Sequence, residues 1–226
     1  MKVGLFDSGI GGLTVLKTLI KKYPNNEYIY YGDTLNVPYG NKSREELLIL
    51  SKNNMEFLIN KGAELIIIAC GTVSSNCLDY LKASYNIPII SIVSPTIEYL
   101  KNSNYKNIGV IATNATINSH IFKNNIINKN FIEIATPELV PIIENNKFDE
   151  LDMVLHKYLD GINIDVLVLG CTHYPLVKDK ISSIISCDII DMSEYVSISE
   201  GNTKGLSIYF SKLDDKIRDN VKRIIK

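Results

Sequence analysis

The sequence lacks an excess of charge of either sign. It has 24 Lys and Arg residues against 25 Asp and Glu residues in 226 positions, so its formal net charge is −1. Proteins that bind nucleic acids need a cationic surface, which this balance does not provide. The composition therefore argues against a nucleic-acid partner and favours a small-molecule ligand.

Long apolar runs are absent as well. The longest, at residues 65–70, is far shorter than the roughly 18 residues that a membrane-spanning helix requires. The segment after Met1 also lacks the apolar stretch and the small-residue cleavage site of a signal peptide. We therefore expect a soluble, cytoplasmic protein without a membrane partner.

Cysteine is scarce, with four residues in the chain. Secreted proteins that rely on disulfides contain a larger share, and thiols stay reduced in the cytoplasm. The four cysteines are therefore expected to be free thiols. The sequence also lacks the closely spaced Cys and His pairs that usually reveal a zinc site, and we predict no metal.

No linker rich in Gly, Ser or Pro interrupts the chain, and short runs of Ile, Val and Leu alternate with amphipathic stretches. This alternation is typical of an α/β fold, in which helices cover buried parallel strands. We expect strands at 2–6, 27–31, 65–69, 87–92, 107–112, 131–135, 166–170 and 189–191. Helices are expected at 13–22, 43–61, 149–159 and 214–225.

Two of these strands end in similar segments, Leu-Ile-Ile-Ile-Ala-Cys-Gly-Thr at 65–72 and Val-Leu-Val-Leu-Gly-Cys-Thr-His at 166–173. Each places a cysteine directly after a buried strand, where open α/β sheets carry their functional residues. The similarity indicates two lobes that face each other. We predict a first lobe of residues 1–94 plus 201–226 and a second lobe of residues 95–200.

Cys70 and Cys171 are the leading candidates for catalysis. Either could instead be a buried structural residue, which is a common role of cysteine. Backbone N–H groups at the start of a following helix stabilise a thiolate and lower its pKa, and His173 follows Cys171 by two positions. The repeated context makes joint catalysis the better interpretation. Cys77 and Cys187 lack this context and are expected to be structural.

A glycine-rich loop, Phe-Asp-Ser-Gly-Ile-Gly-Gly-Leu at 6–13, follows the first strand. It lacks the third glycine of a dinucleotide-binding loop and the Lys-Ser/Thr of a phosphate-binding loop. Its glycines would allow backbone N–H groups to approach a ligand anion such as a carboxylate. Asp7 in this loop would act as a helix cap or as a partner of a nearby thiol. Glu144, taken by itself, is expected to be a solvated residue.

Six segments of the chain resemble, in the same order, the motifs of the glutamate racemases: 6–13, 37–40, 69–72, 108–119, 136–144 and 170–175. The Ala-Cys-Gly-Thr and Gly-Cys-Thr-His-Tyr-Pro motifs are the most specific of them. The resemblance spans nearly the whole chain. It implies two flavodoxin-like lobes with parallel sheets, with the active site in the cleft between them.

The resemblance also implies a cofactor-independent enzyme that interconverts L- and D-glutamate and supplies D-glutamate for peptidoglycan. One cysteine, as a thiolate, would remove the α-proton, while the other, as a thiol, would donate a proton to the opposite face. Asp7, His173 and Glu144 would serve proton transfer at the two thiols. The residues implied to hold the substrate are Ser8, Pro38, Tyr39, Gly40, Gly71, Thr72 and Thr172.

Gly71 departs from the family pattern, which has Ala-Cys-Asn-Thr where this chain has Ala-Cys-Gly-Thr. An amide side chain expected to bind the substrate is therefore missing, and we expect Gly71→Asn to raise kcat/KM for glutamate. The departure keeps two alternatives open: an aspartate racemase, and a racemase-like protein that binds carboxylates with weak or no turnover. A homodimer is one possible assembly of this protein, and the sequence alone does not establish the oligomeric state.

Overall fold

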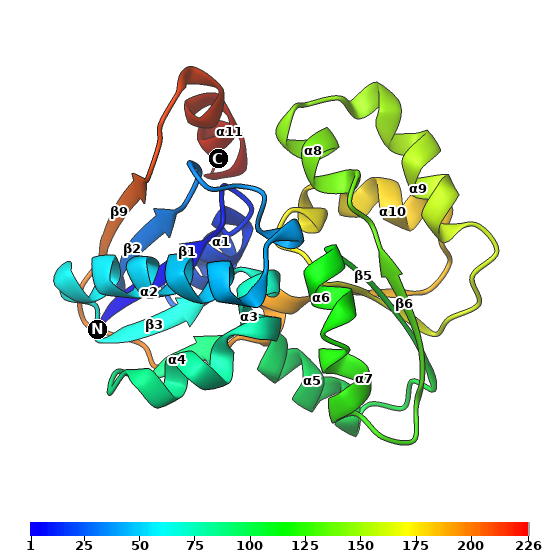
Figure 1. Ribbon diagram of the computed structural model, residues 1–226, viewed down its shortest axis with the longest axis horizontal. Helices are drawn as coiled ribbons and strands as arrows, with labels where there is room; N and C mark the ends of the chain where they lie inside the picture. Colours follow the sequence, from blue (N-terminus) through cyan, green and yellow to red (C-terminus); the bar gives the residue numbers. More distant parts are fainter. Residues whose placement is uncertain (226) are drawn as a thin grey trace.

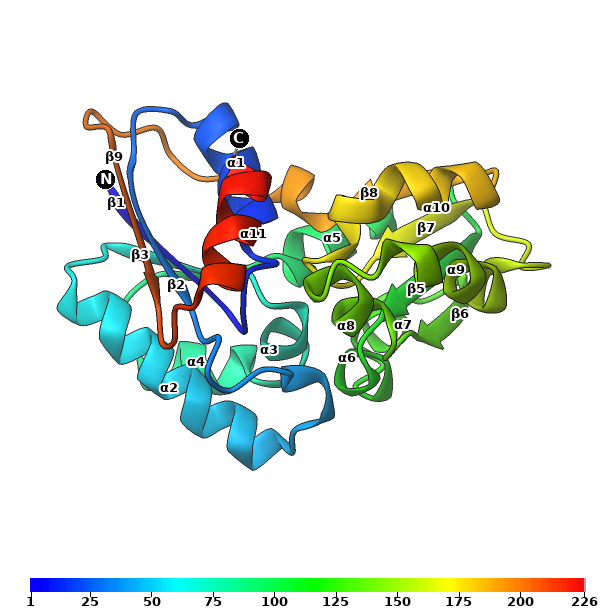
Figure 2. The same cartoon turned by 90° about the horizontal axis from the view of Figure 1, so that it is seen from above.

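The computed structural model describes residues 1–225 and contains two sheets whose strands all pair in parallel. The first sheet has the order β4-β3-β1-β2-β9 and the second the order β6-β5-β7-β8. Figures 1 and 2 show the two sheets side by side, each with helices packed around it. This arrangement confirms the predicted fold class.

The first sheet consists of β1 (Lys2–Asp7), β2 (Glu27–Gly32), β3 (Leu65–Ile68), β4 (Ile89–Ser91) and β9 (Gly205–Phe210). The second consists of β5 (Asn107–Ala112), β6 (Asn130–Ala135), β7 (Val166–Leu169) and β8 (Asp188–Asp191). Both β3 and β7 are buried along their whole length, which explains their unbroken runs of Leu, Ile and Val. The strands that precede Cys70 and Cys171 thus belong to different sheets.

The helices around the first sheet are α1 (Leu13–Lys22), α2 (Arg44–Asn60), α3 (Gly71–Asn76), α4 (Leu78–Ser84) and α11 (Asp215–Ile225). Those around the second are α6 (Asn114–Asn118), α7 (Ile121–Asn125), α8 (Leu139–Glu144), α9 (Leu151–Leu159) and α10 (Lys178–Ile184). Short 3-10 turns are η1 (Tyr39–Asn41), η2 (Phe148–Glu150), η3 (Tyr174–Val177) and η4 (Met192–Tyr195). None of the helices within residues 1–225 is long and apolar enough to cross a membrane.

Local sequence explains where several of these helices start. The α2 helix begins with a capping box, in which the Ser43 hydroxyl accepts a hydrogen bond from the Glu46 N–H and the Glu46 carboxylate accepts one from the Ser43 N–H. The α6 helix starts at a Thr113 cap, whose hydroxyl accepts from the Thr116 N–H. The predicted helices at 43–61 and 214–225 are found with ends shifted by at most one residue.

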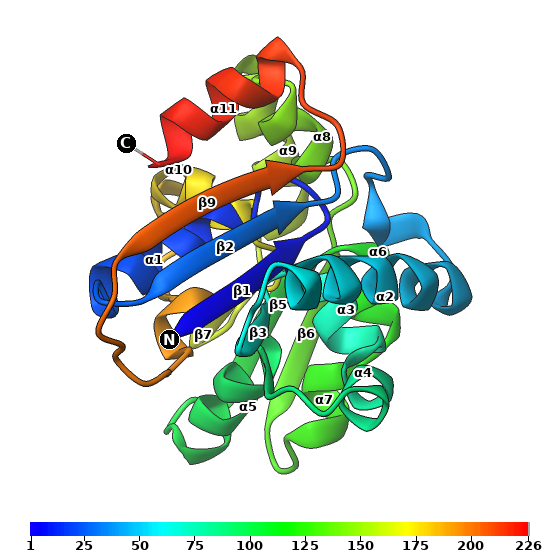
Figure 3. The same cartoon turned by 90° about the vertical axis from the view of Figure 1, so that its left-hand side faces the viewer.

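One strand was not predicted from the sequence. Strand β9 lies at the edge of the first sheet, beside β2, and most of its residues are exposed or half-buried. Figure 3 shows it running in the same direction as β2 and β1. Because an edge strand is only partly buried, it does not need the continuous apolar run by which the other strands were recognised.

The two sheets share a continuous apolar core. One cluster of buried residues includes Val3 and Leu5 of β1, Val110 of β5 and Val168 of β7. Helix α5 (Val93–Asn102) carries the chain from β4 to β5, and its buried residues join the same cluster. The crossing is therefore a packed helix rather than a flexible tether.

The limits of the two lobes remain a prediction. The proposed boundary at Ser94-Pro95 falls within the first turn of α5, and the chain returns to the first sheet through the segment between η4 and β9. The first-lobe range 201–226 ends at Lys226, which lies outside the described residues.

Candidate active site

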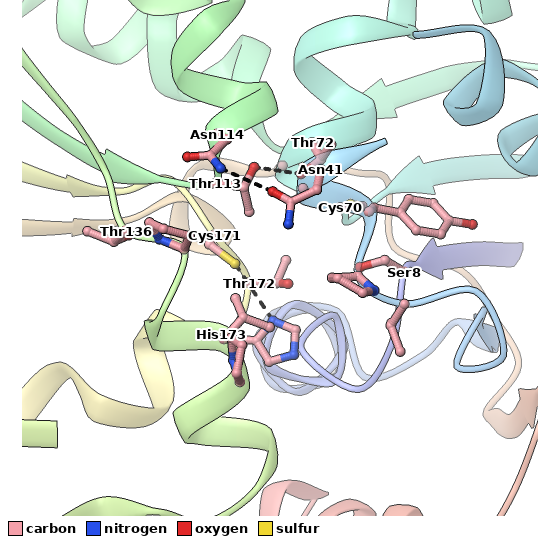
Figure 4. A pocket seen from close by; sticks show the side chains of 18 of the residues that line it. Ser8, Asn41, Cys70, Thr72, Thr113, Asn114, Thr136, Cys171, Thr172 and His173 are labelled. Carbon is pink, nitrogen blue, oxygen red and sulfur yellow. Dashed lines mark hydrogen bonds between the residues drawn. The ribbon is translucent and has the colours of Figure 1, made fainter. Parts of the chain in front are cut away.

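A pocket lies between the lobes, at the carboxyl ends of β1, β3, β5 and β7 (Figure 4). Every residue that the sequence implicated in the site lines this pocket, with the exception of Asp7. Four more polar residues line it that the sequence did not identify: Asn41, Thr113, Asn114 and Thr136. Thr113 and Asn114 directly follow β5, so the strand-end argument that singled out the two cysteines applies to them too.

The two cysteines reach this pocket from opposite sheets. Cys70 follows β3 and directly precedes α3, whereas Cys171 follows β7. They are only 4% and 7% exposed, and both are free thiols. A ligand in the pocket would therefore have one thiol on the side of each lobe.

Cys171 is part of a chain of hydrogen bonds with His173 and Glu144. The Cys171 Sγ lies 3.7 Å from His173 Nδ1, and His173 Nε2 lies 2.9 Å from Glu144 Oε1. Burial opposes protonation of His173, but its hydrogen bonds to Cys171 and Glu144 outweigh this effect and raise the pKa of His173 well above 6.5. A protonated imidazole at this position donates a hydrogen bond to each of its two neighbours.

Glu144 is therefore not the solvated residue that its sequence context suggested. It ends α8, and its side chain is 21% exposed. Burial works against its charged form, but the hydrogen bond with His173 prevails and holds the pKa of Glu144 below 4.5. The helix α11 supports this region, because Asn220 Nδ2 donates to the Glu144 carbonyl oxygen at 3.3 Å and Lys216 Nζ donates to Asn145 Oδ1 at 2.6 Å.

The environment of Cys70 favours its protonated thiol. Burial raises the pKa of Cys70 to about 12, and the negative charge of Asp7 acts in the same direction. The Val73 N–H and the Ser8 hydroxyl oppose these effects without cancelling them. The expectation that N–H groups at the α3 start lower this pKa is therefore wrong in its net direction. The two thiols therefore have different neighbours: Cys171 lies beside the His173 imidazole, whereas Cys70 is close to the Asp7 carboxylate.

Asp7 lies behind the pocket and joins the lobes. Its Oδ2 accepts hydrogen bonds from the N–H groups of Gly9 and Gly12, each at 3.0 Å, and its Oδ1 accepts one from Thr172 Oγ1 at 3.3 Å. Burial raises the pKa of Asp7, while the charge of His173 offsets part of this effect. The glycine loop does bind a carboxylate through its N–H groups, but that carboxylate belongs to the protein.

The same loop approaches His173 closely. A Cβ atom at Gly11 would lie 2.4 Å from His173 Nδ1. This distance is shorter than van der Waals contact allows, so the two atoms would clash. The glycine at this position thus makes room for the imidazole ring of the other lobe, rather than for a ligand.

Gly71 is a second point at which the two lobes approach each other closely at the site. A Cβ atom there would lie 2.5 Å from the backbone carbonyl oxygen of Gly170, the residue before Cys171. The φ angle of Gly71 is not in the positive range, so the constraint is space rather than backbone conformation. An asparagine at this position could therefore contact a substrate only if the Gly170 carbonyl shifted.

The remaining polar groups of the pocket are neutral. The Thr72 and Thr113 hydroxyls lie 2.9 Å apart, one from each lobe. The hydroxyl of Tyr39 is turned away, because it donates to Asp33 Oδ2 at 2.6 Å and accepts from Asn54. Tyr39 can therefore offer a ligand only its backbone. No Lys or Arg lines the pocket within residues 1–225, and no cluster of three or more metal-ligand side chains occurs there.

Comparisons with known proteins place this geometry in a family. A sequence profile described as Asp/Glu/Hydantoin racemase matches residues 24–195. The glutamate racemase of Fusobacterium nucleatum is 42% identical over 200 residues, which cover 84% of this chain and 76% of that protein. The family match and this relative confirm the resemblance that the motifs indicated.

Two solved structures extend the likeness to the whole fold. The glutamate racemase of Campylobacter jejuni has a TM-score of 0.91 at 32% identity, covering 99% of this chain and 97% of that one. The glutamate racemase of Francisella tularensis, solved in complex with D-glutamate, has a TM-score of 0.88 at 31% identity, covering 99% and 93%. Since sequence and fold agree over nearly the full chain, this protein belongs to the family of aspartate, glutamate and hydantoin racemases.

Proposed function

We propose that the protein interconverts L- and D-glutamate, with Cys70 and Cys171 as the two proton-transfer groups. The observation that carries this proposal is the presence of two thiols from opposite lobes in one pocket, with Cys171 within hydrogen-bonding distance of His173. Removal of an α-proton on one face and delivery on the other requires one group as base and one as acid. A pair of unlike thiols meets that requirement without a cofactor.

In the proposed reaction, the Cys171 thiolate takes the α-proton from one enantiomer and becomes a thiol. The Cys70 thiol then gives its proton to the opposite face of the planar carbanion, and so becomes a thiolate. The reverse reaction runs through the same groups in the other order. His173 lies within hydrogen-bonding distance of Cys171, and Glu144 lies within hydrogen-bonding distance of His173. We therefore assign both residues to proton transfer at Cys171.

The polar residues around the thiols supply neutral contacts for an acidic amino acid. Ser8, Thr72 and Thr172 offer hydroxyls, while Pro38 and Gly40 shape the loop that closes the pocket. These residues, with the backbone of Tyr39, are proposed as the substrate-binding set, and Asp7 as the group that sets the environment of Cys70. The D-glutamate formed would supply bacterial peptidoglycan.

The absence of an amide side chain at Gly71 does not by itself favour a protein without turnover, because the close carbonyl of Gly170 accounts for the glycine. A cytoplasmic location and a homodimeric assembly remain part of the proposal. Sedimentation of the purified protein would measure its assembly.

Incubation with L-glutamate or L-aspartate in deuterated water tests the reaction and its substrate. We expect deuterium to appear at the α-carbon of glutamate, together with the D enantiomer, at a rate well above that for aspartate. Faster exchange of aspartate would support the aspartate racemase alternative. Binding of glutamate without exchange would mark a carboxylate-binding protein.

A further inference from the structure

Two carboxamides from opposite lobes meet at the mouth of the pocket. Asn41 ends η1, Asn114 begins α6, and both residues line the pocket. Asn114 Nδ2 donates a hydrogen bond to Asn41 Oδ1 at 3.1 Å. In Figure 4 the nitrogen of the Asn41 carboxamide points into the pocket.

The hydrogen bond from Asn114 determines how the Asn41 amide is oriented. An asparagine amide has one acceptor and one donor group, and Asn114 occupies the acceptor. Asn41 Nδ2 donates to no other residue within the part of the chain that the structure describes. The free donor is therefore held over the pocket by a contact from the other lobe.

A substrate with two carboxylates needs such a donor here. No Lys or Arg among residues 1–225 lines the pocket, so apart from the imidazole of His173 only neutral groups are available to meet the negative charges. The Thr72 and Thr113 hydroxyls are paired with each other. Residue 71 carries no side chain, and the carbonyl of Gly170 leaves no room for one. Asn41 thus provides a carboxamide donor that position 71 cannot provide.

We propose that Asn41 is a substrate-binding residue, whose Nδ2 donates a hydrogen bond to a carboxylate of the amino-acid substrate. Asn114 is a positioning residue that acts through Asn41. This inference rests on the proposed function in taking an acidic amino acid as the ligand. It adds a specificity-determining contact that bridges the two lobes when substrate is bound.

Calorimetric titration of D-glutamate into the whole protein tests the proposal. For Asn41→Ala we expect Kd to rise about tenfold, the loss typical of one hydrogen bond to a charged group. Asn41→Asp should weaken binding further, because it replaces the donor by a negatively charged acceptor. The Asn41→Asp variant keeps an oxygen that can accept the hydrogen bond from Asn114. If Asn41 only linked the two lobes, the Kd for D-glutamate would therefore hardly change in this variant.

Asn118→Asp is the matched control, because it adds the same charge at an exposed position of α6 that does not line the pocket. Its Kd should stay close to that of the wild type. In steady-state kinetics the Asn41 variants should raise KM more than they lower kcat. An Asn41→Asp protein that binds glutamate as tightly as the Asn118→Asp control would overturn the proposal.

A double-mutant cycle tests the positioning role of Asn114. If Asn114 acts through Asn41, Asn114→Ala should weaken binding in the wild-type background and have no further effect once Asn41 is alanine. Equal effects in both backgrounds would refute this role. Binding of glutamate without α-proton exchange would overturn the proposed function alone, whereas a wild type that binds neither glutamate nor aspartate would overturn both.

Discussion

The backbone carbonyl oxygen of Gly170 lies 2.5 Å from the position that a Cβ atom at Gly71 would occupy. Gly71 follows Cys70 and Gly170 precedes Cys171, so the two lobes are in close contact beside the two thiols. A side chain at residue 71 would therefore separate the lobes before it could contact a substrate.

This contact reverses the effect expected of Gly71→Asn. We now expect the substitution to lower kcat/KM for glutamate by about tenfold or more, because a shift of about 1 Å between reacting groups can cost a hundredfold in rate. Gly71→Ala serves as the comparison, since it adds the Cβ atom without the amide. A kcat/KM above that of the wild type for Gly71→Asn would contradict the steric argument. A loss with such a steric cause does not count against glutamate as the substrate.

Replacement of either catalytic candidate by serine should reduce racemisation by orders of magnitude, since a hydroxyl is a much poorer base than a thiolate. The Cys70→Ser and Cys171→Ser proteins should each retain slow exchange of the α-proton in only one enantiomer, and in opposite ones. The exchange is measured in deuterated water, by following deuterium incorporation into L-glutamate and into D-glutamate in separate reactions. Cys77→Ser is the control and should remain active. Full racemisation by either catalytic variant would rule out the two-thiol mechanism.

Removal of the charge on Asp7 should make Cys70 easier to ionise. The negative charge of Asp7 is one cause of the pKa of about 12 at Cys70, so Asp7→Asn should lower this pKa measurably. The pKa of Cys70 is measured from thiolate absorbance as a function of pH. The titration curves of the wild type and of Asp7→Asn are each compared with the curve of the same protein carrying Cys70→Ser, which isolates the signal of Cys70. If the titration attributed to Cys70 does not move, Asp7 has no electrostatic effect on it.

The Glu144–His173 pair should stabilise the fold within a defined pH range. The pKa of His173 is raised above 6.5, so its contribution is complete below pH 6.5 and is lost as the pH rises through the raised value. The pKa of Glu144 is lowered below 4.5, so its contribution is complete above pH 4.5 and is lost as the pH falls through the lowered value. The pair is therefore strongest between pH 4.5 and pH 6.5, and its contribution declines as the pH rises from 6.5 through the raised pKa of His173.

Glu144→Gln should reduce the free energy of unfolding most within that range, by about 3 kcal/mol, as expected for a buried charge that loses its partner. Urea unfolding of both proteins over a series of pH values measures the difference. Glu138→Gln is a suitable control, because its ion pair with Lys157 is exposed and such pairs contribute little. A difference between wild type and Glu144→Gln that does not change with pH would contradict the assignment.

Much of the fold and the core of the site follow from local sequence. The buried strands that precede Cys70 and Cys171 are recognisable from their apolar runs, and the strand-end rule brings the two thiols to the same region. The rule could also have identified Thr113 and Asn114, which follow β5. These predictions succeed because they depend on short segments whose burial is determined by their own composition.

Other features depend on how distant segments pack. Glu144 is 29 positions from His173, and nothing in its neighbours signals the hydrogen bond between them. The contact of Gly71 with Gly170 depends on how closely the lobes approach each other. Motif resemblance identified Glu144 by position, but the spatial reason for Gly71 is visible only in the folded chain.

The helix α11 gives the site an order of assembly. It belongs to the first lobe, yet its Asn220 donates to the Glu144 carbonyl and its Arg223 donates to Asn146 Oδ1 at 2.7 Å in the second lobe. Both cysteines, His173 and Glu144 precede α11 in the chain and are therefore synthesised before it. Newly made chains therefore contain every proposed proton-transfer group before they contain the helix that supports Glu144, and the site reaches its final geometry only when β9 and α11 have docked.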